Sequence, residues 1–169
     1  FKMKILWVVN TIFPDLARYL SLTAPVFGGW MYGLATDLAT SNNITLAVVT
    51  VYSGSDMKSF AINGIRYYLI PNNKNKIKNG VHISEWTSLI SEFKPDIVHI
   101  HGTEYGHGMD LMNARPNLRY VVSIQGLVSV YHRYFLAGMT MWEVLRNITF
   151  RDIVRRNTLF HAKCDFFKR

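Results

Sequence analysis

The sequence predicts an α/β fold, a Rossmann-like doubly wound parallel sheet of at least five strands with helices on both faces. Apolar, β-branched segments alternate along the chain with segments of helical pattern, as expected for successive parallel βαβ units. The 169 residues are 49% hydrophobic and 18% charged, which is typical of one globular domain with a buried core. The first apolar segment, residues 3–10, is almost continuous, and parallel strands covered on both faces have this pattern.

Five segments have the length and composition of strands. They are rich in apolar and β-branched residues, and the Asn63-Gly64 turn leads into the strand predicted at residues 65–70. The predicted strands are residues 3–10, 44–52, 65–70, 97–101 and 120–124.

Two segments between the strands have helix signals. Gly28-Gly29 opens a helix that is expected to run to about residue 41. A second is expected over residues 84–93, with Ser84 as its N-cap and Pro95 just beyond its end. The intervening residues 11–27 are expected to be irregular, with Pro14 and Pro25 breaking any helix, and a loop of this length favours a functional role.

Two further helices are predicted near the C-terminus. Thr140 with Glu143, and Thr149 with Asp152, have the spacing of capping boxes. The segment 146–169 carries seven arginines and lysines against two aspartates, and several phenylalanines. It is either a helix that packs its aromatic side chains inward or a basic amphipathic helix that lies on anionic lipid.

Charge and cysteine content limit the partners and the compartment. The net charge of +8 favours anionic partners such as phosphorylated substrates, anionic lipid or nucleic acid. No surface of interleaved basic and aromatic residues typical of nucleic-acid binding is evident outside 151–169, and no nucleic-acid partner is predicted. Cys164 is the single cysteine, so an internal disulfide and a cysteine zinc site are excluded, which is consistent with the cytoplasm. No apolar run approaches the ~18 residues that span a bilayer.

Ligands of open parallel sheets bind beyond the carboxyl ends of the strands, so the residues that follow each strand are the candidate site. Asn10 and the Gly28-Gly29 pair follow the first strand, and His101, Gly102 and Glu104 follow the fourth. Gln125 and Gly126 follow the fifth. We expect these three groups to converge.

Gly28-Gly29 at a helix N-terminus has two interpretations. Bare backbone lets a phosphate approach the unpaired N–H groups and the positive end of the helix dipole. Alternatively, the pair provides a tight turn that requires positive φ. The long preceding loop favours the phosphate.

Histidines at positions 99 and 101 share one face of their predicted strand. We expect His99 to be a hydrogen-bonded core residue and His101, at the strand end, to face the cleft. A metal site is not predicted, because the remaining histidines show no ligand spacing. A nicotinamide site is not predicted either, because about seventeen residues separate the glycines from the first strand and no acidic residue ends the second.

The order of these motifs resembles the N-terminal domain of glycosyltransferase family 4, the retaining enzymes of GT-B fold. The segments that carry the resemblance are MKILWVVN (3–10), FGGWMYGLA (27–35) with Leu38-Ala39, GIRYY (64–68), KPDIVHIHG (94–102) and VSIQGL (122–127). The resemblance implies a hexosyltransferase of polysaccharide biosynthesis, cytoplasmic or peripheral at the inner membrane face. Its donor would be a nucleotide-diphosphate sugar, its acceptor a glycan or a lipid-linked sugar, and it would need no cofactor.

The resemblance also implies roles for individual positions. Gly28 and Gly29 resemble the glycine loop that faces the donor diphosphate. His101-Gly102 and Gln125-Gly126 resemble the loops that line the cleft near the reacting sugar. From their positions after the strands, Asn10 is a further substrate-binding candidate, and His101, Glu104 and Gln125 are the cleft candidates for catalysis. Many members have histidine at the position of Gln125, and an amide cannot take a proton.

The donor half of the family is not recognisable in this sequence. Family members hold the donor with two glutamates eight positions apart in a C-terminal domain, and Glu85, Glu92, Glu104 and Glu143 have no such spacing. We therefore expect residues 1–169 to be one acceptor-side domain that is inactive by itself. A sugar-nucleotide epimerase of the same architecture and a non-catalytic binding domain remain alternatives.

Overall fold

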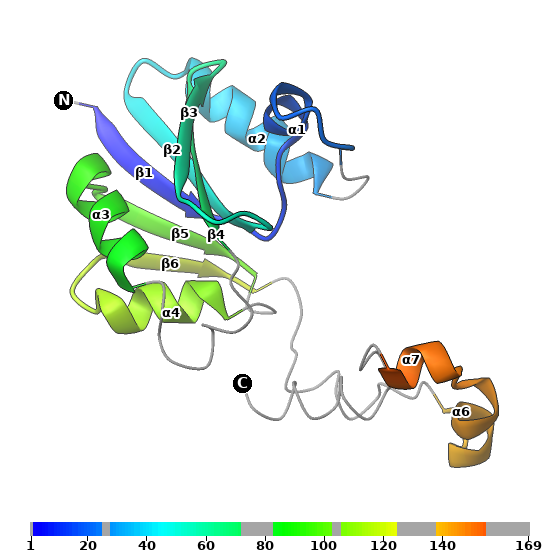
Figure 1. Cartoon of the computed structure of the whole chain (residues 1–169). Helices are drawn as coiled ribbons and strands as arrows, with labels where there is room; N and C mark the ends of the chain where they lie inside the picture. Colours follow the sequence, from blue (N-terminus) through cyan, green and yellow to red (C-terminus); the bar gives the residue numbers. More distant parts are fainter. Residues whose placement is uncertain (1, 25–27, 72–82, 103–105, 125–137, 155–169) are drawn as a thin grey trace. The chain divides into compact units, whose positions relative to one another are not determined.

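The computed structural model describes residues 2–24, 28–71, 83–102, 106–124 and 138–154 (Figure 1). The chain divides into two compact units, Phe1–Ser123 and Ile124–Arg169, and each is described by itself. The expected sites Glu104, Gln125 and Gly126 lie outside the described residues.

The first unit is built on a six-stranded sheet in the order β3-β4-β2-β1-β5-β6. All pairings are parallel except that of β3 with β4, which is antiparallel. This confirms the predicted α/β, Rossmann-like class. The strands are β1 (Met3–Val8), β2 (Ile44–Tyr52), β3 (Lys58–Ile62), β4 (Ile65–Pro71), β5 (Ile97–His101) and β6 (Tyr120–Ser123).

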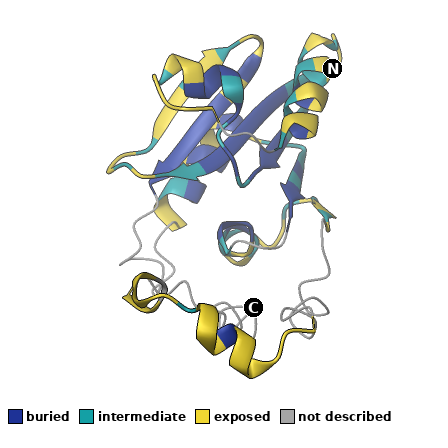
Figure 2. Cartoon of the chain, turned by 90° about the vertical axis from the view of Figure 1, so that its right-hand side faces the viewer, coloured by how far each residue is buried: buried dark blue, intermediate teal, exposed yellow. Residues whose placement is uncertain are grey.

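Helices cover both faces of this sheet (Figure 1). Alternate residues of β1 point to opposite faces: Leu6 and Val8 pack in one core cluster, and Trp7 and Val9 in the other. Helices α3 (Ile83–Phe93) and α4 (His107–Ala114) contribute to the first cluster, and α1 (Pro14–Tyr19) and α2 (Gly29–Thr40) to the second. Buried residues accordingly run along the strands in Figure 2.

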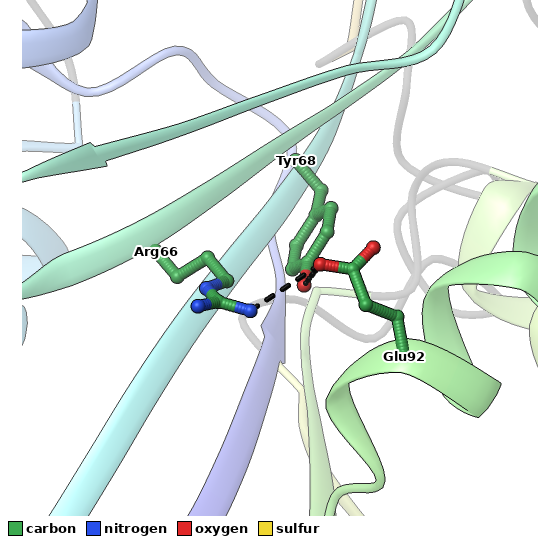
Figure 3. A network of polar contacts seen from close by, with 3 residues as sticks. All are labelled: Arg66, Tyr68 and Glu92. Carbon is green, nitrogen blue, oxygen red and sulfur yellow. Dashed lines mark hydrogen bonds and ion pairs between the residues drawn. The ribbon is translucent and has the colours of Figure 1, made fainter.

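Two adjacent tyrosines of β4 attach helices to opposite faces of the sheet. The Tyr67 hydroxyl donates to both carboxylate oxygens of the buried Asp15 in α1, at 2.9 and 3.0 Å. The Tyr68 hydroxyl donates to Glu92 of α3 at 3.0 Å, and Arg66 donates to the same oxygen at 3.3 Å (Figure 3). Period-two alternation along β4 therefore links both helical layers to one strand.

Three details of the predicted elements are wrong. Pro14 begins helix α1 instead of preventing it, because proline is well suited to the first helical position, where its missing N–H has no partner to lose. Ser84 is the second residue of α3 and its hydroxyl donates to Glu85, so it is not the N-cap. Strand β3, the antiparallel partner of β4 across the Asn63-Gly64 turn, is absent from the prediction because its residues are half-exposed or exposed and lack an apolar run.

The second unit contains α6 (Met141–Asn147) and α7 (Phe150–Val154). The predicted capping box of α6 is present: Thr140 Oγ1 accepts from the Glu143 N–H, and the Thr140 N–H donates to the Glu143 carboxylate at 2.7 Å. Helix α7 follows Thr149 as predicted, whereas the side chain of Asp152 lies outside the described part. Among the helices of the described ranges, none is long and apolar enough to cross a membrane.

Candidate functional site

The ends of β1 and β5 lie side by side at the carboxyl edge of the sheet. Val8 pairs with Ile100 in the parallel register, so the two strands end level with each other. Just beyond, the side-chain amide of Asn10 donates to the carbonyl of His101 at 3.2 Å. Asn10 and His101, both predicted site residues, are therefore brought together by the register of the two strands.

Gly28 is the N-cap of α2 and has left-handed backbone geometry, with φ 83° and ψ 12°. A Cβ at this position would lie 3.1 Å from Thr11 Cγ2 and 3.1 Å from Met31 Cε. The closeness to Thr11, three residues beyond the end of β1, places the glycine pair at the carboxyl edge as predicted. The second interpretation, a tight turn with positive φ, also holds, because Gly28 has the left-handed conformation that glycine adopts without strain.

Gly29 is different from its neighbour. Its φ lies outside the left-handed region, and a Cβ there would meet no heavy atom of the described chain within 4 Å. Gly29 is the first residue of α2 and precedes the first N–H that bonds within the helix, that of Met31 to the Gly28 carbonyl at 3.0 Å, and no side chain of the described part caps this end. N–H groups at such a position are of the kind that bind anions.

His101 is enclosed by aromatic rings. Its side chain is only 1% exposed, and its ring centroid lies 3.9 Å from that of His99 and 4.4 Å from that of Trp7. The indole of Trp30, in the first turn of α2, is 5.8 Å away. Within the described residues neither ring nitrogen of His101 has a hydrogen-bond partner.

Burial and, to a smaller extent, the neighbouring His99 lower the pKa of His101 to about 4. The imidazole is therefore neutral at pH 7 and offers one donor and one acceptor. A buried group of this kind is usually hydrogen-bonded, so a ligand hydroxyl or a water molecule would be stabilising here.

His99 is hydrogen-bonded, as predicted, but it is only partly buried whereas His101 is fully buried, so the expectation that His99 is the core residue of the pair is wrong. Its Nε2 lies 2.7 Å from the hydroxyl of Ser123 at the end of β6, and burial lowers its pKa. The hydrogen bond orients the ring that stacks on His101. His107 was not predicted to take part, yet its buried ring donates to the carbonyl of Val9 at 3.2 Å and fastens α4 to the end of β1.

Gly102 is buried at the end of β5, with φ 88°, and its N–H donates to the carbonyl of Ser123 at 2.9 Å. It continues the ladder between β5 and β6 and turns the chain at the edge of the site. Across the described residues, no three histidine, cysteine, aspartate or glutamate side chains gather in a way that could hold a metal ion.

Sequence patterns did not identify Trp7, Trp30 and Ser123 as neighbours of the site. Trp7 lies on β1 opposite His99 in the register, and Ser123 lies opposite His101 on β6. Trp30 follows the glycine pair directly, which was the one available signal.

The sheet order, the parallel strands and the helices on both faces define an α/β, Rossmann-like domain, consistent with one half of a GT-B fold. Among solved structures, the sucrose-phosphate synthase of Thermosynechococcus elongatus is similar, with a TM-score of 0.52 and 11% sequence identity. The match covers 85% of this chain and 39% of that chain. No family model matches the sequence, and no curated protein is significantly similar to it.

Proposed function

We propose that this chain is the N-terminal domain of a retaining glycosyltransferase and that Gly28-Gly29 faces the diphosphate of a nucleotide sugar. The observation that carries the proposal is the uncapped N-terminus of α2 at the carboxyl edge of the sheet, beside the buried, unpartnered His101. The similarity in fold to a sucrose-phosphate synthase supports the class. The sequence motifs shared with family 4 support the finer assignment.

Sugar transfer at this site requires that the substrates be positioned and that the charge on the departing diphosphate be stabilised. When a sugar leaves its nucleotide, negative charge grows on the departing diphosphate, and N–H groups at a helix N-terminus stabilise it without reorganising. A neutral His101 can hydrogen-bond a sugar hydroxyl as donor and acceptor at once. Transfer is expected to need a second, donor-binding domain, and the chain spans 39% of the synthase that it matches.

The low pKa of His101 favours the glycosyltransferase proposal over the epimerase alternative. An epimerase needs a group that exchanges a proton with a sugar carbon or hydroxyl near neutral pH. Burial keeps His101 neutral down to a pH of about 4, which makes it a weak base. A hydrogen-bonding role is therefore favoured over proton transfer at this position.

The proposal is tested by Gly29→Val. The new side chain has room, because a Cβ at Gly29 meets nothing within 4 Å, so the melting temperature should change little. The valine would stand over the N–H groups that bind phosphate, and losing hydrogen bonds to a charged group should weaken binding of UDP or GDP roughly tenfold or more. Calorimetric titration and thermal melting on the same protein measure both effects.

Gly28→Ala is the matched control. Its left-handed backbone and its 3.1 Å contacts with Thr11 and Met31 predict a loss of about 1–2 kcal/mol in the free energy of unfolding. A Gly29→Val protein that melts several degrees lower but binds the nucleotides unchanged would contradict the phosphate assignment.

A second proposal concerns the second unit, which we infer contacts an anionic membrane surface. The large side chains of α6 and α7 are exposed: Trp142 is 83% exposed and Phe150 82%, so the inward packing of aromatic residues considered above is wrong for Phe150. Arg146 lies one turn after Trp142, and Arg151 directly follows Phe150. Exposed aromatic and basic side chains together favour the headgroup region of anionic lipid.

A further inference from the structure

Trp30 is an unusual neighbour for a buried histidine. Its side chain is 56% exposed, yet its ring lies 5.8 Å from that of His101, which is 1% exposed. The indole therefore covers part of the imidazole with one side and presents the rest of its surface to solvent. An indole offers a large apolar face together with one N–H donor, and tryptophan is enriched in binding surfaces for this reason.

Trp30 is also the most exposed of the described rings around His101. It follows Gly28 and Gly29, and positions 29 and 33 have open space where a Cβ would stand. The other rings around His101 are restrained: Trp7 is buried in the sheet and His99 is hydrogen-bonded to Ser123. Of the described rings in contact with His101, Trp30 can thus move at the least cost in lost packing.

Both ring nitrogens of His101 lack partners in the described part of the chain and are closed off from solvent. A ligand reaches them only when a covering group moves. The ligand must offer hydroxyls for the imidazole and a flat apolar face for the indole, and a pyranose ring has both on adjoining sides.

We propose that Trp30 is the sugar-recognition residue of this site: its indole moves off His101 and stacks on the C–H face of a bound pyranose, whose hydroxyls then hydrogen-bond the imidazole. This assignment rests on the proposed function, in which the backbone N–H of Gly29 beside it holds the diphosphate. The pyranose is either that of the donor or that of the acceptor, and the experiment separates the two.

The chain has four tryptophans, so fluorine NMR of protein labelled with fluorotryptophan gives one resonance for each, assigned by single Trp→Phe variants. The probes are UDP-glucose and GDP-mannose, the bare nucleotides UDP and GDP, and the methyl glycosides of glucose and mannose. We expect a sugar-bearing probe to shift the Trp30 resonance, while buried Trp86 reports an unchanged fold. A shift with nucleotide sugars only indicates the donor sugar, and a shift with methyl glycosides indicates the acceptor.

Affinity provides the second measurement. Trp30→Ala should weaken binding of the responding sugar about tenfold, the usual scale of one aromatic stacking contact, and leave the bare nucleotide unaffected. Trp30→Phe keeps a ring and should restore most of the affinity. Leu34→Ala, which truncates another exposed apolar side chain one turn along α2, is the control and should bind as before.

Equal Trp30 shifts with UDP and UDP-glucose, and with GDP and GDP-mannose, would overturn the assignment, because the ring would then sense the base or phosphate. Unchanged sugar affinity in Trp30→Ala would overturn it too. In both cases the proposed function is still supported if Gly29→Val loses nucleotide binding. Nucleotides that do not bind at all count against the proposed function itself.

Discussion

At the scale of single residues, His101 shows how burial determines chemistry. Charge on an imidazole is disfavoured where water is excluded, and the neighbouring ring of His99 lowers the pKa of His101 further. The consequence is a hydrogen-bonding group at the carboxyl edge of the sheet that is neutral at pH 7.

The lowered pKa predicts a pH dependence of stability. An unfolded histidine has a pKa of about 6.5, whereas His101 in the folded chain has a pKa of about 4. Between these values the unfolded chain binds a proton that the folded chain does not, so the free energy of unfolding falls as the pH is lowered from about 6.5 toward 4. The fall attributable to His101 should be on the order of 1 kcal/mol for each pH unit, because one proton is involved.

Urea unfolding at several pH values measures this slope. His101→Asn keeps a polar side chain without the titration and should flatten the curve in the same window. His99 also has a lowered pKa, so a smaller slope should remain. A wild-type curve that is flat between pH 6.5 and 4 would contradict the neutral state of His101.

At the scale of elements, the two tyrosines of β4 allow the stability contribution of a buried hydrogen bond to be compared with that of a partly buried one. Asp15 is buried and receives the Tyr67 hydroxyl on both oxygens, whereas the carboxylate of Glu92 that receives Tyr68 belongs to a half-exposed side chain. Burial and the adjacent Asp15 raise the pKa of Tyr67, so its hydroxyl stays protonated as a donor.

Tyr67→Phe should therefore be clearly more destabilising than Tyr68→Phe. The first change leaves a buried carboxylate short of a donor, which costs about 1–3 kcal/mol. The second leaves Glu92 with Arg66 and with water, and exposed pairs contribute at most about 1 kcal/mol. Chemical denaturation of both variants gives the comparison, and equal losses would show that the Asp15 contact does not hold α1 to the sheet.

At the scale of the whole molecule, the two units carry different surfaces. The first unit buries its apolar residues between the sheet and four helices, while the described helices of the second unit leave most of theirs exposed. The net charge of +8 and the arginines beside Trp142 and Phe150 favour an anionic partner for that exposed surface.

Liposome co-sedimentation of the whole chain tests the membrane proposal. Binding should rise with the fraction of anionic lipid and fall with added salt, because screening weakens attraction to the headgroups. Replacing Trp142 and Phe150 together by alanine should release the protein from vesicles, whereas Leu22→Ala, an exposed apolar residue of the first unit, should not. Binding that is indifferent to anionic lipid would end this proposal.

The sequence alone determined the fold class and most element positions. Residues 44–52 and 97–101 were predicted with the observed bounds, because continuous apolar, β-branched runs are specified locally by the need to bury both faces of a parallel strand. The capping box at Thr140 was also predictable, since its donors and acceptors lie within three residues. The glycine pair at the start of a helix and the placement of His101 at the end of its strand followed from the same local patterns.

Only the tertiary structure decided which groups meet. The register of β1 against β5 and of β5 against β6 brings Trp7, Ser123 and the two histidines together. The structure also shows that Gly28, and not Gly29, has the positive φ. The protonation of His101 depends on rings contributed by three separate elements, and burial by residues distant in sequence is a property that no local pattern encodes.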